Sequence, residues 1–526
     1  MSVTQQRPGV TVSAPPPAST ALSPSIRLIV TICTVMATLM QSLDSTIANV
    51  ALPYMQGTMS ASEEEINWVL TSYIVAAAIM TAPTGFLAAR FGRTRLYVTA
   101  VAGFTIASIL CGMSQSLEQI VLFRVLQGMF GAALVPLSQA VMYDIYPPQQ
   151  RAVAMSIWTM GVMIGPICGP ILGGWLTENY SWRWVFYINV PFGIITVLGL
   201  LKFLKETAFG ASVRLDWLGF GALSLGIGAL QLVLDRGETL DWFGSQEIVV
   251  EACLAGLGFY AFMVQFWLAP RPFISPKLFA DRNFVVGVVL YFIMGLIMYA
   301  TLALLAPYLQ NLMNYPVVTA GIVLAPRGVG LMFAAMMCGR LLGRVSARLV
   351  VGFGFVTGAY ALYLMTLWTP DVSEFSLVEA GFIQGISIGF LAIPINIIAF
   401  ATLPPEQRIA ATSIYSLMRN LGSAIGISVT GALLEINTQV NHALIAADAN
   451  PFNRALHEGV AARYWNLATT HGAAMLNQEI TRQARIIAYV DDFKLMLVLA
   501  VIAIPLLLLT RPASTGSPAA VSHSSD

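Results

Sequence analysis

The stretch Pro147-Pro-Gln-Gln-Arg151-Ala-Val-Ala-Met-Ser156 recurs later in the chain as Pro404-Pro-Glu-Gln-Arg408-Ile-Ala-Ala-Thr-Ser413. Further matches lie at almost the same offset, about 255 positions, and pair Pro53-Tyr-Met-Gln56 with Pro307-Tyr-Leu-Gln310 and Gln127-Gly128 with Gln384-Gly385. Chance does not produce several matches at one nearly constant offset. The chain therefore contains two copies of one unit, joined in the same orientation.

Almost the whole chain consists of apolar segments long enough to cross a membrane. Of its 526 residues 57% are hydrophobic and 10% are charged, whereas soluble proteins carry about 25% charged residues. A helix needs roughly 20 apolar residues to cross the hydrocarbon of a bilayer. We predict fourteen such helices, at about 27–51, 67–89, 96–115, 119–142, 153–175, 184–204, 216–235, 247–269, 284–308, 318–339, 349–369, 378–402, 410–434 and 493–510.

The repeat and the spans together predict an all-α polytopic membrane protein with two parallel six-helix halves and two inserted central helices. Halves related in this way are typical of transporters that bind their substrate between the halves, near the middle of the membrane. The predicted segments are a disordered tail at 1–25, a first half at 26–205, the inserted helices at 206–283, a second half at 284–510 that includes a long loop at 436–492, and a tail at 511–526.

Lysine and arginine gather in one set of short loops, which gives the predicted orientation. Arg151 and Lys202 lie in this set, whereas the short loops opposite hold little beyond Arg183 and Arg236. Because cytoplasmic loops carry the excess of positive charge, both termini are predicted to be cytoplasmic. The long loop at 436–492 then lies on the outer side.

Composition and motifs argue against several other classes of protein. A net charge of +1 suggests no nucleic-acid partner. The five cysteines lie in apolar runs at spacings of neither a disulfide framework nor a metal site. The chain has no Gly-Lys-Ser/Thr phosphate-binding motif, so ATP is not the predicted energy source. Gly385-Ile-Ser387-Ile-Gly389 fits a nucleophile elbow but lies inside a predicted span, so we expect no catalytic residue and no enzyme. We also expect no metal site.

One acid, Asp44, lies within the first apolar run, where an ionised carboxylate costs roughly 2.5–3.5 kcal/mol. The cost falls if the acid is protonated, or if it faces a wet cavity and a cation. Asp44 is therefore a candidate proton carrier. The alternative is a side chain that extends to the outer headgroups.

The two copies differ in their charges at this level of the membrane. At the repeat offset Asp44 corresponds to Met298, and Arg124, inside the fourth span, corresponds to Gly381. Charges found in one copy only are better candidates for chemistry than residues shared by both. We interpret Arg124 as the cation that tunes the proton affinity of Asp44; the alternative is a hydrogen-bond hub for backbone carbonyls.

Other polar residues within the spans are weaker candidates for contact with a substrate or a counter-ion. They are Asn49, Gln127, Arg327, Gln384 and Arg419. Methionine and aromatic residues of the second copy face lipid, pack against their neighbours, or line a pocket that adapts to apolar substrates.

The fifth span has a glycine at every fourth position, with prolines between them: Gly161, Gly165, Pro166, Gly169, Pro170, Gly173 and Gly174. Small residues at this spacing form one groove that lets another helix approach closely. Proline removes helical hydrogen bonds and permits bending. We predict a conformational hinge at the contact between the halves; static tight packing is the alternative.

The loop after the second span combines glycine and arginine on the predicted cytoplasmic side: Gly85, Arg90, Gly92, Arg93 and Arg95. These arginines can form a cytoplasmic gate by pairing with acids or helix C-termini in one conformation only. A plain excess of positive charge inside the cell accounts for the same residues.

Together these motifs resemble the fourteen-span drug:proton antiporters of the major facilitator superfamily, and are most similar to the EmrB-type multidrug efflux permeases. Leu43–Pro53 is similar to the first-span motif, Arg124–Gly128 to the fourth-span motif and Gly165–Gly174 to the fifth-span antiporter motif. The stretch Leu234–Glu247 resembles an outer loop of the EmrB type. The chain departs from the family at Ala89, where many relatives have Asp, so the nearby arginines need another partner.

The resemblance implies the major-facilitator fold and proton-driven export of hydrophobic or amphipathic toxic compounds by alternating access. The proton is then the coupling ion, and no other cofactor is expected. In the bilayer of a bacterial inner membrane, the implied partners are a periplasmic membrane-fusion adaptor protein and an outer-membrane channel. Alternatives are a transporter-like receptor or assembly subunit that binds a partner through 436–492, an exporter of one endogenous metabolite or fatty acid, and an importer.

Overall fold

The computed structural model describes residues 23–147, 150–204, 216–237, 240–270, 272, 274–342, 344–404, 407–447, 449, 453, 465 and 469–511. Within these ranges every regular element is a helix, in agreement with the predicted fold class. The predicted tails at 1–25 and 511–526 lie, apart from 23–25 and 511, outside the described residues.

The first half consists of six membrane-length spans, three of which are each formed by two consecutive helices. The spans are α1 (Pro24–Met59), α2 (Glu63–Thr81) with α3 (Thr84–Phe91), α4 (Arg93–Met113), α5 (Leu117–Gly131) with α6 (Leu134–Ile145), α7 (Arg151–Asn179), and α8 (Trp184–Tyr187) with α9 (Asn189–Phe203).

The second half repeats this arrangement after two inserted helices. The inserted pair is α10 (Trp217–Arg236) and α11 (Gln246–Leu268), and the second half comprises α12 (Arg282–Pro307) with the π-helix η4 (Tyr308–Leu312), α13 (Val317–Leu341), α14 (Ala347–Thr366), α15 (Glu374–Phe400), α16 (Arg408–Ala447) and α18 (Thr470–Leu506). Three short 3-10 helices are η2 (Trp242–Gly244), η3 (Pro276–Ala280) and η7 (Leu507–Leu509).

The spans agree with the fourteen predicted from the apolar runs. Twelve segments of the described chain are long and apolar enough to cross a membrane, and α2 with α3 forms a thirteenth that is bent by 57°. The remaining predicted span is α7, an unbroken helix of 29 residues that packs between α1 and α13. The protein is therefore a polytopic helical membrane protein.

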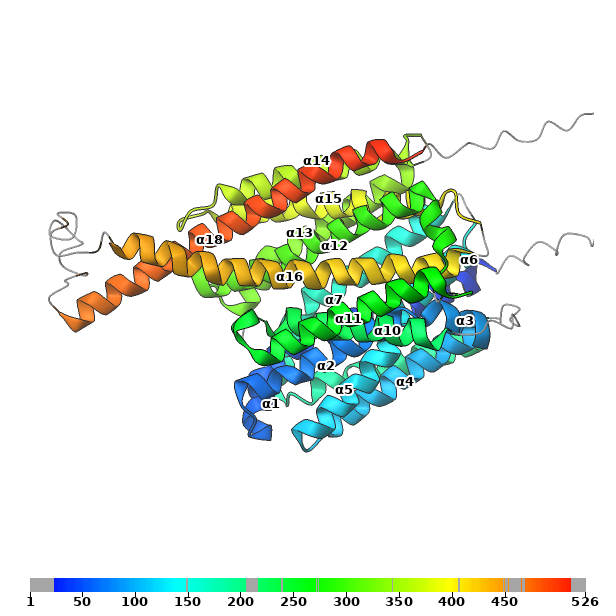
Figure 1. The fold of residues 1–526 in the computed structure, drawn as a ribbon, viewed down its shortest axis with the longest axis horizontal. Coiled ribbons are helices and arrows are strands. Elements are labelled where there is room, and N and C mark those ends of the chain that lie inside the picture. The colour runs from blue at the N-terminus through cyan, green and yellow to red at the C-terminus, as the bar shows by residue number, and fades with distance from the viewer. Residues whose placement is uncertain are drawn as a thin grey trace, which may run out of the picture.

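The inserted helices lie across the junction of the two halves. Figure 1 shows the first half in blue and cyan, the second half running from light green (α12) through yellow to red (α18), and the green α11 between the two. α10 packs on α2 of the first half and on α16 of the second. Its Leu223 and Ile227 belong to the same buried cluster as Tyr415 of α16. The pair therefore covers one side of the contact between the halves.

The sequence repeat is also visible in the packing of the helices. α1 packs along α7 as α12 packs along α16, and α2 packs on α5 as α13 packs on α15. Gly128 of α5 lies against the backbone of Tyr73, and its counterpart Gly385 of α15 lies against the backbone of Arg327. Tyr73 and Arg327 thus occupy equivalent positions in the two halves.

The segment 436–492, predicted to be a long loop, is helical at both ends. α16 continues to Ala447 and α18 begins at Thr470, and the two helices extend together beyond the bundle at the left of Figure 1. His442 Nε2 and Asn477 Oδ1, 2.9 Å apart, connect them. The prediction of a loop was wrong at these two ends. The sequence there is too polar to indicate a membrane-spanning helix, and each helix is stabilised by packing on the other. His457 lies outside the described residues.

Candidate functional site

The first half contains a fully buried ion pair between α1 and α5. Arg124 Nη1 lies 2.6 Å from Asp44 Oδ2, and both side chains are 0% exposed. Gln127 Nε2 donates to Asp44 Oδ1 at 2.8 Å, and Asn189 Nδ2 donates to the same oxygen at 3.3 Å. Donors from α5 and α9 therefore hold both oxygens of a carboxylate on α1. The alternative of an Asp44 side chain that extends to the headgroups does not apply.

Arg124 is held on several sides besides its contact with Asp44. Its Nε donates to the carbonyl of Val69 at 2.9 Å, and its Nη1 also donates to Gln127 Oε1 at 2.9 Å. The guanidinium carbon lies 4.1 Å from the centre of the Tyr73 ring, at cation–π distance. Arg124 is thus both the cation beside Asp44 and a hydrogen-bond donor to a backbone carbonyl. The two roles that the sequence analysis offered as alternatives therefore occur together.

This pair is sensitive to the charge of either partner. Two charges taken out of water gain little in net free energy by pairing, whereas removing one partner strands the other at a cost of about 3–5 kcal/mol. Protonation of Asp44 neutralises the carboxylate, so it too leaves Arg124 without its anion. A change in the charge of Asp44 therefore alters the contact between α1 and α5.

The glycines of α7 receive the opposite face of α1, directly beside Asp44. A Cβ on Gly165 would lie 2.6 Å from Ser42 Oγ and 2.7 Å from the backbone nitrogen of Leu43. Ser42 Oγ donates to the carbonyl of Val162 at 2.7 Å. Gly161, Gly169 and Gly173 likewise face Val35, Thr46 and Ile47 of α1, whereas Gly174 has more room.

The groove holds α1, a helix of the same half, while α7 itself packs on α13 of the second half, as predicted for a helix at the contact between the halves. The spacing of glycines predicts a groove but not which helix fills it. α7 reaches the second half elsewhere, where Ile171 meets Gly321 of α13. The helix continues through Pro166 and Pro170, whose side chains lie outside the described part of the chain.

Gly165→Ala is expected to destabilise the protein by about 1–3 kcal/mol, because the new methyl group collides with the backbone of α1. Gly174→Ala is the matched control on the same helix, since its Cβ would lie 3.9 Å from Val50 Cγ1. The higher helix propensity of alanine makes that control neutral or slightly stabilising. Thermal inactivation of the two purified variants measures the difference, and equal melting temperatures would contradict the packing described here.

The glycine–arginine loop after α2 forms an ion pair within the first half. Gly92, with φ 92°, ends α3 in the left-handed region that favours glycine. Arg93 at the start of α4 pairs with Asp144 of α6. Asp144 is thus the acid with which this arginine pairs. Gly85 is buried in α3, whereas Arg90 and Arg95 are exposed.

The halves meet at the end of the bundle where lysine and arginine gather. Tyr143 Oη of α6 donates to Asn396 Oδ1 of α15 at 2.6 Å. One buried cluster there joins both halves and includes Trp158 of α7 and Cys338 of α13. The clusters at the opposite end, around Trp182 and around Trp368, each belong to one half. The structure is therefore closed at the arginine-rich end.

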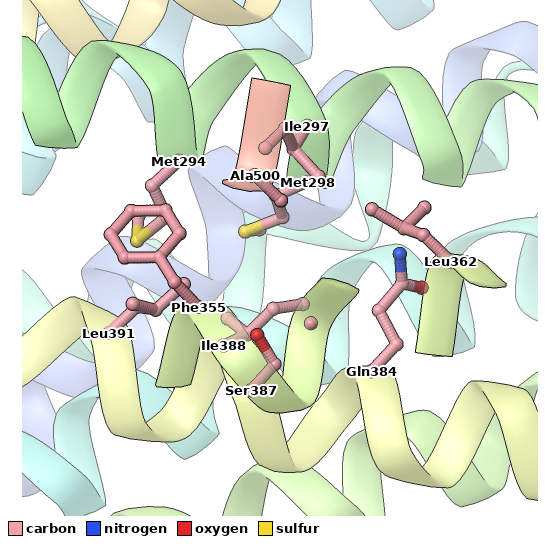
Figure 2. Close-up of a pocket in the computed structure, with 11 residues that line it drawn as sticks. Met294, Ile297, Met298, Phe355, Leu362, Gln384, Ser387, Ile388, Leu391 and Ala500 are labelled. Atoms are coloured by element: carbon pink, nitrogen blue, oxygen red, sulfur yellow. The ribbon is translucent and has the colours of Figure 1, made fainter. Parts of the chain in front are cut away.

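The second half has no ion pair at the position equivalent to Asp44 and Arg124 within the described residues. Gln384 corresponds to Gln127 of the first half; it is 3% exposed, and neither its nitrogen nor its oxygen has a partner. Figure 2 shows its amide pointing into a cavity of about 20 Å³, large enough for about one water. Met298 lines the same cavity.

The remaining predicted contact residues have different surroundings. Arg327 is 8% exposed and Arg419 is half-buried; both contact α12. Asn49 lies on an exposed part of α1 and does not join the Asp44 cluster. The structure thus brings Asp44, Arg124 and Gln127 together and leaves Asn49 apart.

Sequence reasoning missed three residues of interest. Asn189 and Tyr73 belong to the Asp44–Arg124 cluster. Asn189 is a polar residue in an apolar run, the same signal that identified Asp44, whereas a tyrosine in a span carries no such signal. Asp492 of α18 is 1% exposed, and neither of its carboxylate oxygens has a partner.

Comparison with known proteins places the chain in a family. The family model described as Major Facilitator Superfamily matches residues 34–427. The chain is 36% identical over 487 residues to the fatty acid resistance protein FarB of Neisseria gonorrhoeae, covering 92% of this chain and 96% of that protein. It is 36% identical over 472 residues to the multidrug export protein EmrB of Escherichia coli K12, covering 89% and 92%.

A solved structure shows the same fold. The inward-facing, occupied crystal structure of a bacterial homolog to the human lysosomal transporter Spinster matches with a TM-score of 0.56 and 21% identity. The match covers 94% of this chain and 100% of that one. Fold, internal repeat and sequence similarity agree, and the chain belongs to the Major Facilitator Superfamily of membrane transporters.

Proposed function

We propose that this protein is a proton-driven antiporter that exports hydrophobic or amphipathic toxic compounds by alternating access. The observation that carries the proposal is the fully buried Asp44–Arg124 pair. A buried carboxylate is costly while it is charged, and binding a proton removes that charge. The multidrug export protein EmrB, similar over most of its length, supports efflux as the direction of transport.

The geometry suggests how a proton and a substrate exchange. With Asp44 ionised, Arg124 and Gln127 bind its two oxygens and fix α1 against α5. A proton on Asp44 weakens both contacts, and α1 then moves together with α7, into whose glycine groove it is packed. Because α7 also packs on α13, this motion reaches the second half and changes which end of the bundle is open.

We further infer a location in the bacterial inner membrane with both termini in the cytoplasm. The arginine-rich end of the bundle, which includes the Arg93–Asp144 pair, then faces the cytoplasm, in keeping with the usual excess of positive charge there. The extension formed by α16 and α18 projects from the opposite end. It is the surface we assign to a periplasmic adaptor protein, which would connect the transporter to an outer-membrane channel.

Transport by the purified protein separates this function from a receptor or an assembly role. Proteoliposomes that hold the protein and a fluorescent lipophilic cation should move the dye when a pH gradient is imposed, and should not do so without it. Dye movement in the direction opposite to the proton flow indicates an antiporter. A failure to move any of a panel of lipophilic cations, neutral compounds and weak acids would favour the receptor.

Cys338 offers a direct test of alternating access, because it is buried where the halves meet. Tyr143→Phe removes the 2.6 Å bond to Asn396. A bond of this kind is worth about 1 kcal/mol, so opening of the arginine-rich end should become about fivefold more frequent. In a variant whose other cysteines are replaced by alanine, labelling of Cys338 by a maleimide should accelerate by the same factor.

The matched control is Tyr97→Phe, which removes an equally short bond, from Tyr97 Oη to Ser138 Oγ at 2.6 Å, within the first half. It should leave the labelling rate of Cys338 unchanged, because it does not join the two halves. Equal rates in the two variants would mean that the Tyr143–Asn396 contact does not hold this end closed.

A further inference from the structure

We propose that the two inserted helices position the proton site, because a polar cluster at the C-terminal end of α10 fixes the turn of α2 that holds Arg124. This inference rests on the proposed proton-driven function and names two positioning residues for it, Thr71 and Asp235. The cluster lies in the stretch Leu234–Glu247, at the junction of α10 and α11.

One turn of α2 lies between the proton site and the inserted helices. On one side the carbonyl of Val69 accepts from Arg124 Nε at 2.9 Å, and the centre of the Tyr73 ring lies 4.1 Å from the guanidinium carbon. Thr71 stands between these two residues in the chain, so its side chain points to the opposite side of the helix. α10 packs on α2 there. The position of this turn therefore determines how Arg124 is held beside Asp44.

The C-terminal end of α10 contacts the same turn at two points. Thr71 is 2% exposed, and its Oγ1 donates to Asp235 Oδ2. The guanidinium carbon of Arg236 lies 4.9 Å from the centre of the Trp68 ring, at cation–π distance. A hydrogen bond to a carboxylate is roughly twice as strong as one between neutral groups. These contacts fix α2 from the side opposite to Arg124.

Arg236 is itself held by the second inserted helix. Its Nη1 lies 2.5 Å from Glu247 Oε1 and 3.3 Å from Glu251 Oε1, both on α11. Glu251 is 8% exposed, so its contact with Arg236 lies between the helices. Gly237 caps α10, and a Cβ there would lie 2.7 Å from the ring of Trp242. Ion pairs and close packing thus tie the junction of α10 and α11 together, and the junction supports α2.

The inserted helices reach Asp44 through α2. The titratable groups that interact with Asp44 in the described part of the chain are Arg124, Tyr73 and Cys111, which lie on α5, α2 and α4. Loss of the bond to Asp235 lets the turn of α2 move, and Arg124 is then held less firmly beside the ionised carboxylate. Because a nearby cation favours the charged form of an acid, Asp44 should then take up its proton at a higher pH.

Infrared difference spectra between pairs of pH values, recorded on the full-length protein in lipid nanodiscs, measure this proton uptake. The band of a protonated carboxyl group that disappears in Asp44→Asn belongs to Asp44, and its amplitude against pH gives a midpoint. Thr71→Val keeps the size of the side chain and removes the bond to Asp235. It should raise the midpoint by about half a pH unit or more. Thr71→Ser keeps the hydroxyl and should restore the normal midpoint.

Asp235→Ala removes the same bond from the other side and separates positioning from a direct effect of charge. Loss of a negative charge alone would make Asp44 release its proton at a lower pH, whereas loss of the support for α2 raises the midpoint. The double variant with Thr71→Val should equal Thr71→Val alone, because both changes remove one bond. If Asp235→Ala does not fold, the comparison of valine with serine at position 71 still decides.

The matched control is Thr81→Val, the same substitution at another buried threonine of α2. Its Oγ1 donates to the carbonyl of Ala77 at 2.7 Å, within the helix, so the midpoint should stay unchanged. An unchanged midpoint in Thr71→Val would overturn the proposal. An equal shift in Thr81→Val would do the same, since it would mean a general response of α2 to the loss of a hydroxyl.

The midpoint is measured without substrate, so the result is independent of transport. A shifted midpoint in a protein that moves no substrate refutes the export function alone. Proton-driven transport together with an unchanged midpoint in Thr71→Val refutes only the positioning role. If no band depends on Asp44, the proton-binding role of this residue and the present inference are both refuted.

Discussion

Replacing Asp44 with asparagine is expected to reduce proton-driven export to the level of liposomes without protein. The asparagine side chain has the size of the aspartate and still accepts hydrogen bonds from Gln127 and Asn189, but it cannot take up or release a proton. The hydrogen-bond partners of Asp44 are Arg124, Gln127 and Asn189, none of which is an acid that could take over the proton. Coupling is therefore lost while the substrate site is retained.

Proteoliposomes measure this result in two ways. Uptake of a lipophilic cation driven by an imposed pH gradient should disappear in Asp44→Asn, whereas exchange of labelled for unlabelled substrate without a gradient should continue. Asp371→Asn, which changes an exposed acid between α14 and α15, should behave like the unaltered protein. Gradient-driven uptake at the normal rate in Asp44→Asn would remove this residue from the coupling mechanism.

Arg124→Gln is expected to destabilise the protein by about 3–5 kcal/mol, because it leaves Asp44 as a buried charge without its cation. Gln127 and Asn189 still donate to Asp44 Oδ1, but the oxygen that received Arg124 Nη1 at 2.6 Å is left without its partner. The variant should therefore show a clearly lower melting temperature and a smaller yield of folded protein.

The double variant Asp44→Asn with Arg124→Gln makes this prediction specific. Removing both charges removes the penalty of either unpaired charge, so the double variant should recover at least half of the lost stability. It should not recover proton-driven transport, because it still has no acid to protonate. If the costs of the two single changes simply add, the two residues are not coupled and the ion pair does not explain their burial.

The packing of α1 and α7 connects the ion pair to the second half and so accounts for coupling between proton binding and rearrangement of the halves. The residues that mark this path are Asp44, Gly165 and Ile171. α1 carries Asp44 on the side that faces α5, while its Ser42 and Thr46 lie in the glycine groove of α7. α7 in turn packs on α13 of the second half. A change at the ion pair therefore reaches the contact between the halves through two helices, α1 and α7.

Much of this fold could be predicted from the sequence, because the membrane imposes simple rules. Each crossing needs about 20 apolar residues, so the spans follow from composition alone. The repeat of Pro147–Ser156 at Pro404–Ser413 then gives the two parallel halves. Single charges such as Asp44 and Arg124 stand out in apolar runs because their burial is costly.

Other features depend on tertiary packing, which the sequence does not reveal. The 2.6 Å contact joins Asp44 and Arg124 across 80 positions, and nothing in either span indicates their relative depth and rotation. The glycines of α7 predict a close neighbour without identifying it as α1. The extension of α16 and α18 was predicted as loop because each helix is too polar to suggest a span and is stabilised by its partner.

The most direct measurement is the number of protons that the purified protein releases when it binds tetraphenylphosphonium, a permanent cation that cannot carry a proton itself. In weakly buffered solution with a pH indicator, the unaltered protein should release about one proton for each cation bound. The Asp44→Asn variant should bind the cation and release none. Binding without proton release by the unaltered protein, or equal release by both proteins, would contradict the central claim that Asp44 exchanges its proton for substrate.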